Sequence, residues 1–171
     1  YALTKNIPVL QPPNLKDPAF LEDLERIAPD LQIVVAFRMM PEKVWKLPTM
    51  GTFNLHASLL PQYRGAAPIN WAIINGEKET GITTFFLQQE IDTGKIIFQE
   101  KVEITAEDTA GTLHDKLMQA GSSLVLKTVE SIMDKKIHPI DQNAMVAGAS
   151  LKNAPKLNSE NTRVDIIHMD E

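Results

Sequence analysis

The sequence predicts an α/β domain in which buried strands alternate with helices. Residues 31–37 form a nearly continuous run of β-branched and other apolar residues, which is typical of a strand buried on both faces. Residues 109–134 are the longest stretch with helical periodicity, and shorter strand and helix patterns lie between these two segments. With 171 residues, the chain is long enough for one domain with a real hydrophobic core.

Composition and charge exclude several broad classes of protein. Apolar residues make up 43% and charged residues 23% of the chain, values that are ordinary for a folded domain and unlike a disordered chain. No apolar run approaches the ~20 residues that span a bilayer, no secretory signal is visible, and cysteine is absent. We therefore expect a cytoplasmic protein without disulfides. The 17 basic and 22 acidic residues give a net charge of −5, which argues against a broad phosphate-binding surface.

The first part of the chain predicts a strand, a helix and a second strand. Residues 7–10 are a short apolar run closed by two prolines, which indicates a strand. Asp17 and Pro18 open a helical pattern that ends at Pro29. Because residues 31–37 follow as a strand, a parallel βαβ unit is the simplest arrangement.

Shorter elements follow along the rest of the chain. We expect a short helix over 41–47, a strand over 51–56, an irregular loop over 62–68, a helix over 69–75, strands over 82–87 and 95–104, and the long helix over 109–134. The stretch from residue 144 has weak periodicity, which indicates a closing loop or a linker.

Asn54 and His56 are the first candidates for chemistry. Between residues 49 and 74 the only formal charge is Arg64, and a stretch with so few charges is either core or the wall of a pocket. Arg64 itself either binds an anion or extends its charged group to solvent. Asn54 and His56 lie two apart near the end of a predicted strand, so they share a face, and carboxyl ends of parallel strands open into a ligand crevice. An amide and an imidazole there can hold a carbonyl oxygen that becomes an oxyanion. The alternative is a buried pair that only satisfies nearby backbone groups.

Asp92 lies in an Asp-Thr-Gly sequence after the strand over 82–87. This triplet is most often a simple turn, because Asp tolerates turn geometry and Gly supplies positive φ. An aspartic protease needs two such carboxylates side by side, and the sequence has one copy. Ser58 lacks the Gly-x-Ser-x-Gly pattern of a serine hydrolase nucleophile. No histidine pair has the spacing of metal ligands, so we expect no metal site.

Together these segments resemble the catalytic domain of the 10-formyltetrahydrofolate-dependent formyltransferases. The motifs that carry the resemblance are Asn54-Leu55-His56, Ser58-Leu59-Leu60-Pro61 and Asp92-x-Gly94, in the family's order and spacing. The resemblance implies a Rossmann-like fold, with a mostly parallel sheet flanked by helices, whose N-terminal strands are missing. It implies that residues 1–150 are the second half of the catalytic domain. Residues 151–171 would then begin a linker toward an OB-like C-terminal domain that is absent here.

The resemblance also assigns roles to particular residues. Asn54 and His56 would hold the oxyanion, and Asp92 would orient His56 and relay a proton. The formyl donor would be 10-formyltetrahydrofolate, with its pterin ring against backbone near residues 37–40 and in the loop 88–92. The folate-binding residues that the resemblance implies are Phe37, Arg38, Met40, Ser58, Leu59, Leu60, Pro61, Gln88, Gln89, Glu90 and Ile91.

Within the family, residues 64–69 are most similar to the branch that formylates the amino group of methionyl-tRNA. This similarity implies charged initiator methionyl-tRNA as a partner, bound mainly through segments absent here, and an intact protein that is monomeric and not membrane-bound. Arg38 departs from that branch, which usually has Gly there, and matches purine-pathway relatives. The alternatives therefore stay open: formyl transfer to a sugar-nucleotide or purine-precursor amine, hydrolysis of formyltetrahydrofolate, or a fragment without activity.

Overall fold

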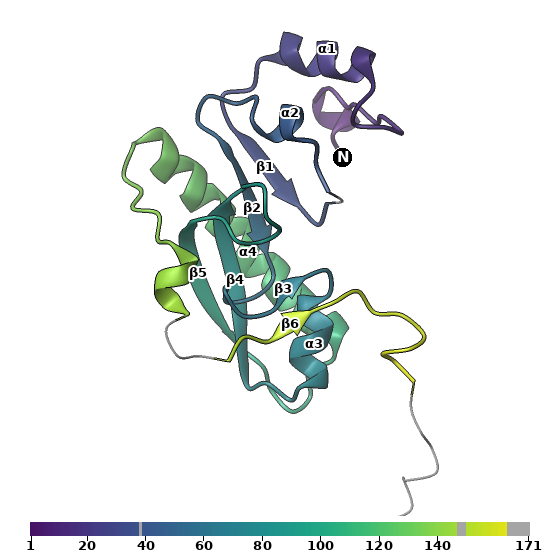
Figure 1. The fold of residues 1–171 in the computed structure, drawn as a ribbon, viewed down its shortest axis with the longest axis vertical. Helices are drawn as coiled ribbons and strands as arrows, with labels where there is room; N and C mark the ends of the chain where they lie inside the picture. The colour runs from purple at the N-terminus through teal and green to yellow at the C-terminus, as the bar shows by residue number, and fades with distance from the viewer. Residues whose placement is uncertain (38, 147–149, 164–171) are drawn as a thin grey trace, which may run out of the picture.

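A four-stranded sheet in the order β1-β2-β4-β5 lies at the centre of the structure (Figure 1). The computed structural model describes residues 1–37, 39–146 and 150–163. The elements are η1 (Leu3–Lys5), α1 (Pro18–Ile27), β1 (Gln32–Val35), α2 (Glu42–Trp45), β2 (Thr52–His56), β3 (Arg64–Gly65), α3 (Pro68–Ile74), β4 (Glu79–Phe86), β5 (Ile96–Glu103), α4 (Ala110–Met133), η2 (Gln142–Met145) and β6 (Asn153–Ala154). None of the described helices is long and apolar enough to cross a membrane.

The α/β class is confirmed, but the sheet formed by the described residues is mixed rather than mostly parallel. β1 runs parallel to β2, whereas β4 is antiparallel to both β2 and β5. The reason lies in α3, which is short and sits beyond the end of β2 (Figure 1). A crossover connection must carry the chain back along the whole sheet before the next strand can be parallel. Because α3 does not do this, β4 begins near the end of β2 and runs back beside it.

Two predictions for the N-terminal part are wrong. Residues 7–10 form no strand within the described chain, so the expected βαβ unit lacks its first strand. An apolar pattern makes a segment suitable for a sheet, but a strand also needs a partner strand. β1 is not buried on both faces, since Ile33 and Val35 are 45% and 53% exposed while Val34 is buried. β1 is the edge strand of the described sheet, and only the face that carries Val34 is covered.

The other predicted elements form close to their expected positions. α1 begins at Pro18, and the Asp17 carboxylate accepts a hydrogen bond from the Ala19 N–H at 3.2 Å. α4 follows Thr109, whose side chain caps its first turn. β4 begins earlier than predicted, and part of the loop over 62–68 forms the short strand β3.

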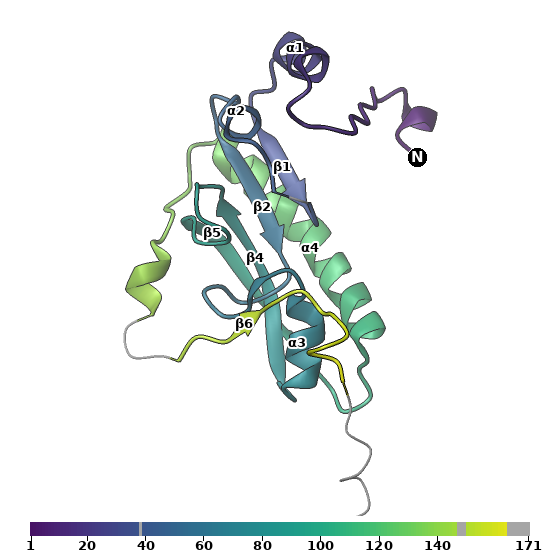
Figure 2. The ribbon, with the colours of Figure 1, turned by 45° about the vertical axis from the view of Figure 1, so that its right-hand side comes forward.

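α4 covers one face of the sheet and supplies much of its apolar packing (Figures 1 and 2). Leu113, Leu117 and Leu124 of α4 are at most 3% exposed and lie in one cluster with Ile82 of β4. Full burial of such a side chain stabilises the fold by roughly 1.5–3 kcal/mol. The opposite face carries loops, with Leu60 packed against Phe85 and Ile96. The two faces are therefore covered in different ways, one by a helix and one by irregular backbone.

The segment 150–155 returns to the loop 62–67 and is hydrogen-bonded along its length (Figure 2). β6 pairs in parallel with β3. Three further bonds run from the loop and from α3 to carbonyl groups of the segment. The Tyr63 N–H donates to Lys152 at 2.6 Å, the Ala67 N–H to Ala154 at 3.1 Å, and the Trp71 Nε1–H to Pro155 at 2.8 Å. At Gly65, φ is +126°, and an added Cβ would lie 2.4 Å from the Ala154 carbonyl oxygen. Only glycine fits a position with this backbone conformation and this contact.

Tyr63, Glu77 and Lys152 form a hydrogen-bonded cluster that ties the same two segments together. The Glu77 carboxylate accepts hydrogen bonds from the Tyr63 hydroxyl and from the Lys152 ammonium group. The bond from Lys152, followed by the bond from Tyr63, lowers the pKa of Glu77. Burial, followed by the bond to Glu77, raises the pKa of the Tyr63 hydroxyl. The cluster is thus most favourable when Glu77 is ionised and Tyr63 is neutral.

We expect Glu77→Gln to lower the free energy of unfolding by roughly 0.5–1 kcal/mol at neutral pH, because an amide attracts Lys152 less than a carboxylate does. Folding lowers the pKa of Glu77, so its contribution is present above the unfolded-state pKa and is lost as the pH falls through the folded-state value. Urea denaturation of both proteins at neutral and at acid pH measures this. The difference between them should shrink in acid, and a difference that does not change with pH would contradict an electrostatic role for Glu77.

Candidate active site

Asn54 and His56 lie on the face of the sheet that carries loops. They alternate with Leu55 along β2, so their side chains share one face. In the neighbouring strand, Phe85 pairs with Asn54 and Thr83 pairs with His56. β2 ends at His56, so the structure places both residues at the carboxyl end of the strand and on one face, as their spacing predicts.

His56 is buried, and its ring is held in a defined orientation. The ring meets Phe85 edge to face, with the centroids 6.4 Å apart and the planes at 82°. Nε2 lies 2.9 Å from the carbonyl oxygen of Tyr63. Because a carbonyl only accepts hydrogen bonds, Nε2 carries the proton in this contact, and the neutral ring therefore has no proton on Nδ1. Nδ1 lies 3.9 Å from Oδ2 of Asp92, which allows charge attraction but is too long for a direct hydrogen bond.

The loop between β4 and β5 brings Asp92 to His56. The Asp92 side chain is 14% exposed, and its Oδ2 accepts a hydrogen bond from the Gly65 N–H at 2.9 Å. Gly94 closes the loop against Phe86, since an added Cβ would lie 1.6 Å from the Phe86 carbonyl oxygen. The chain turns at Asp92, as the Asp-Thr-Gly pattern predicts, but the positive φ belongs to Asp92, at 54°, and not to Gly94. The same turn also directs a carboxylate toward the histidine.

The side-chain amide of Asn54 makes no hydrogen bond to any residue that the structure describes. The residue is half-buried, and buried amide groups in proteins normally have partners. Asn54 therefore has a donor group available for a ligand beside His56. The arrangement brings together a hydrogen-bond donor on Asn54, a proton acceptor on His56 and a carboxylate on Asp92.

The loop after β2 holds four of the residues that the family resemblance links to folate. Ser58, Leu60 and Pro61 are buried, while Leu59 is half-buried. The Ser58 hydroxyl donates to the Gln62 carbonyl at 2.6 Å, and the Leu60 N–H donates to the Thr83 hydroxyl at 3.2 Å. The Ser58 hydroxyl and the Leu60 N–H therefore already have partners, in the loop and in β4 respectively, and a role for these four residues in binding stays a prediction.

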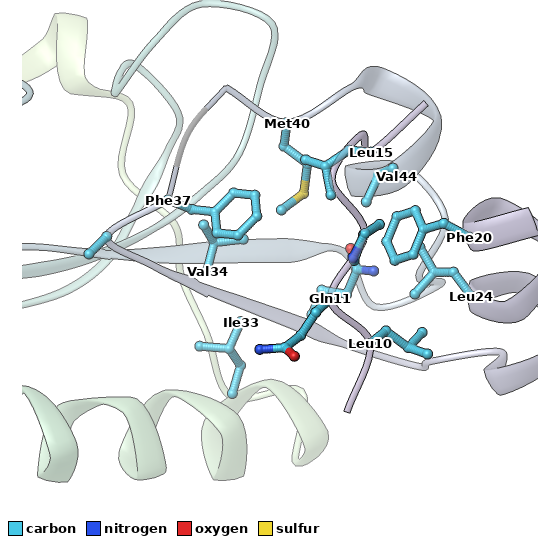
Figure 3. Close-up of a pocket in the computed structure, with 13 residues that line it drawn as sticks. Leu10, Gln11, Leu15, Phe20, Leu24, Ile33, Val34, Phe37, Met40 and Val44 are labelled. Atoms are coloured by element: carbon cyan, nitrogen blue, oxygen red, sulfur yellow. The ribbon is translucent and has the colours of Figure 1, made fainter. Parts of the chain in front are cut away.

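The other predicted folate contacts fall in two places. Gln88, Gln89, Glu90 and Ile91 are exposed on the loop that carries Asp92. Phe37 and Met40 instead line an apolar cavity of about 550 Å³ between β1, α1 and α2. Asn54, His56 and Asp92 do not line this cavity. Figure 3 shows Phe37, Val34 and Met40 on one side of this cavity and Phe20 and Leu24 on the other. Arg38 lies outside the described residues.

Sequence reasoning missed three residues that build the site. Tyr63 and Gly65 act through a backbone carbonyl and a backbone N–H, which no pattern of side chains marks. Gln142 lies in a stretch without periodicity, yet it is 1% exposed and is hydrogen-bonded to the Asp92 loop. Arg64 does not simply extend into solvent, because its Nε and Nη2 donate to Oε1 of Gln142 at 3.1 and 2.6 Å, and its binding of an anion stays a prediction.

Comparisons with known proteins identify relatives of the chain. The sequence profile of the family described as Formyl transferase matches residues 2–129. The chain is 59% identical over 165 residues to a methionyl-tRNA formyltransferase of Bacteroides thetaiotaomicron, a match that covers 96% of this chain and 51% of that protein. The chain thus spans about half the length of the curated relatives it matches.

Solved structures agree with the profile match. A phosphoribosylglycinamide formyltransferase from Bacillus halodurans superposes with a TM-score of 0.71 at 27% identity, over 78% of this chain and 73% of that one. HypX from Aquifex aeolicus, in complex with tetrahydrofolic acid, superposes with a TM-score of 0.71 at 25% identity, over 85% of this chain and 24% of that one. Since the family profile covers most of its length, the chain belongs to the formyl transferase family.

Proposed function

We propose that the protein to which this chain belongs transfers the formyl group of 10-formyltetrahydrofolate to the amino group of methionyl-tRNA. The observation that carries the proposal is the juxtaposition of Asn54, His56 and Asp92 on the loop side of the sheet. Identity of 59% to a methionyl-tRNA formyltransferase supports the choice of acceptor over the more distant phosphoribosylglycinamide formyltransferase. The complex of HypX with tetrahydrofolic acid supports a reduced folate as the donor.

Asn54 supplies the hydrogen bond that the reaction needs at the formyl oxygen. The folate donor supplies the formyl carbon and the leaving nitrogen N10. As the amine nitrogen bonds to the formyl carbon, negative charge develops on the formyl oxygen. The Asn54 amide, which has no partner among the described residues, donates to this oxygen. A preorganised donor of this kind stabilises a transition state by ~3–4 kcal/mol.

His56 moves the proton from the amine to the leaving nitrogen. The Tyr63 carbonyl holds the Nε2–H, so Nδ1 of the neutral ring accepts the proton that the amine nitrogen loses. The resulting imidazolium is stabilised by the Asp92 carboxylate, 3.9 Å from Nδ1. Nδ1 then gives the proton to N10 as the bond between the formyl carbon and N10 breaks. His56 therefore serves first as a base, in place of the oxyanion donor that the family resemblance implies, and donates from Nδ1 only after it has been protonated.

The proposal also covers the folate contacts, the tRNA contacts and the extent of the catalytic domain. The exposed residues 88–91 and the backbone near Phe37 and Met40 would contact the folate. The net charge of −5 is unfavourable for a polyanion, so other segments of the protein would supply most tRNA contacts. Residues 1–150 would be the second half of a catalytic domain, and residues 151–171 would begin a linker.

We expect Asp92→Asn in the full-length protein to lower kcat by about 100-fold or more, because the amide cannot stabilise the imidazolium of His56. Single-turnover formylation of methionyl-tRNA measures the effect. Asp115→Asn is the matched control, since Asp115 is an exposed carboxylate on α4. Wild-type kcat in the Asp92→Asn protein would refute the catalytic role of Asp92.

The choice of acceptor predicts a salt-sensitive reaction. The full-length protein should formylate methionyl-tRNA, with KM for the tRNA rising steeply as salt increases, because phosphate contacts release counterions. Phosphoribosylglycinamide, tested as the acceptor under the same conditions, should not be formylated. Formylation of phosphoribosylglycinamide alone would overturn the assignment of the acceptor and leave the proposed chemistry in place.

A further inference from the structure

Gln142 is a buried amide whose donors and acceptor are all used. It is 1% exposed, at the start of η2. Its Nε2 group donates to the carbonyl oxygens of Asp92 at 2.9 Å and Gly94 at 2.8 Å. Its Oε1 accepts the two hydrogen bonds from Arg64, at 3.1 and 2.6 Å. One side chain thus connects the loop that carries Asp92 to β3.

The backbone that Gln142 holds is in an unfavourable conformation. Asp92 has a φ of 54°, in the left-handed region that non-glycine residues seldom occupy. Such a conformation is better maintained where hydrogen bonds from the surrounding structure hold the backbone. The two hydrogen bonds from Gln142 lie on either side of Thr93 and so fix the turn from both ends.

The contacts of Gln142 form a closed circuit that includes the Asp92 carboxylate. Gln142 binds the carbonyl of Asp92 and the guanidinium of Arg64. The next residue, Gly65, donates its N–H to Oδ2 of Asp92. Main chain and side chain of Asp92 are therefore both fixed relative to β3. The same Oδ2 atom lies 3.9 Å from Nδ1 of His56.

We propose that Gln142 is a positioning residue that sets the Asp92 carboxylate for proton transfer by His56. The inference rests on the proposed function, because it assumes that Asp92 acts in catalysis. Gln142 is hydrogen-bonded to neither His56 nor Asn54, so any effect on them passes through the groups that it does contact. A displacement of a catalytic group by about 1 Å can reduce the rate ~100-fold, so the loss of this contact should be visible in kcat.

Gln142→Glu keeps the bonds that Gln142 accepts from Arg64 and removes the bonds that it donates to the Asp92 loop. A glutamate keeps an oxygen acceptor for Arg64, but it places a second oxygen against the carbonyls of Asp92 and Gly94, where a donor is needed. We expect kcat of the full-length protein to fall roughly 10- to 100-fold. Gln119→Glu makes the same change at an exposed position of α4 and should keep wild-type kcat. If Gln142→Glu does not fold, Gln142→Met, of similar length and without charge, takes its place.

A double-mutant cycle with Asp92→Asn distinguishes positioning from a general structural role. If Gln142 acts through the carboxylate, Gln142→Glu should lower kcat in the wild-type background and add little in the Asp92→Asn background. An equal fold-loss in both backgrounds, or no loss in either, overturns the proposal for Gln142. Unchanged kcat in Asp92→Asn alone would refute the catalytic role of Asp92, and the inference would fall with it, whereas a wild-type protein that does not formylate methionyl-tRNA would refute the proposed function itself.

Hydrogen exchange supplies a readout that does not depend on activity. The Gly65 amide is protected by its bond to the Asp92 carboxylate. In the Gln142 variant that folds, we expect faster exchange at the Gly65 amide, with unchanged protection of the β4 and β5 amides. Unchanged exchange at Gly65 would show that Asp92 keeps its place without Gln142, which also overturns the proposal.

Discussion

Loops, rather than a helix, cover the face of the sheet that holds the candidate site, and every backbone group buried beneath them needs a hydrogen-bond partner. Thr83 shows how the sheet meets this need. It is fully buried, and its hydroxyl donates to the Ser58 carbonyl while accepting from the Leu60 N–H. The Gln99 amide donates to the Leu60 carbonyl from the neighbouring strand. Polar residues of β4 and β5 on this face thus supply hydrogen bonds to the loop above them.

The same requirement orients the residues of the site. The carbonyl of Tyr63 is satisfied by His56, and the N–H of Gly65 is satisfied by Asp92. Rotation of either side chain would leave a buried backbone group without a partner, which costs about 1–3 kcal/mol. His56 and Asp92 are therefore held in place by the groups they satisfy. Preorganisation of this kind is what transition-state stabilisation by fixed dipoles and charges requires.

Local patterns in the sequence were sufficient for part of this architecture. The shared face of Asn54 and His56 follows from the period of two along a strand, and α4 follows from its apolar stripe and its cap. The direction of β4 was not predictable in this way, because it depends on where in space the chain emerges from α3, relative to the end of β2. The role of Gln142 was equally hidden. Its partners lie 48, 50 and 78 positions away in sequence, and the two nearer ones are backbone carbonyls, which any residue could provide.

The segment 150–155 extends this dependence on distant contacts to the C-terminal part of the chain. The Tyr63 N–H donates to the carbonyl of Lys152, and the Tyr63 carbonyl accepts from His56, so one peptide of the loop faces the segment and the next faces the site. The Gln62 side chain adds two bonds across 88 and 90 positions of sequence. A displacement of the segment would leave the Tyr63 N–H unpaired and release the loop that holds His56. The segment before Pro155 is consequently attached to the same loop whose Tyr63 carbonyl holds the His56 ring, so the C-terminal part of the described chain contributes to the position of a candidate catalytic residue.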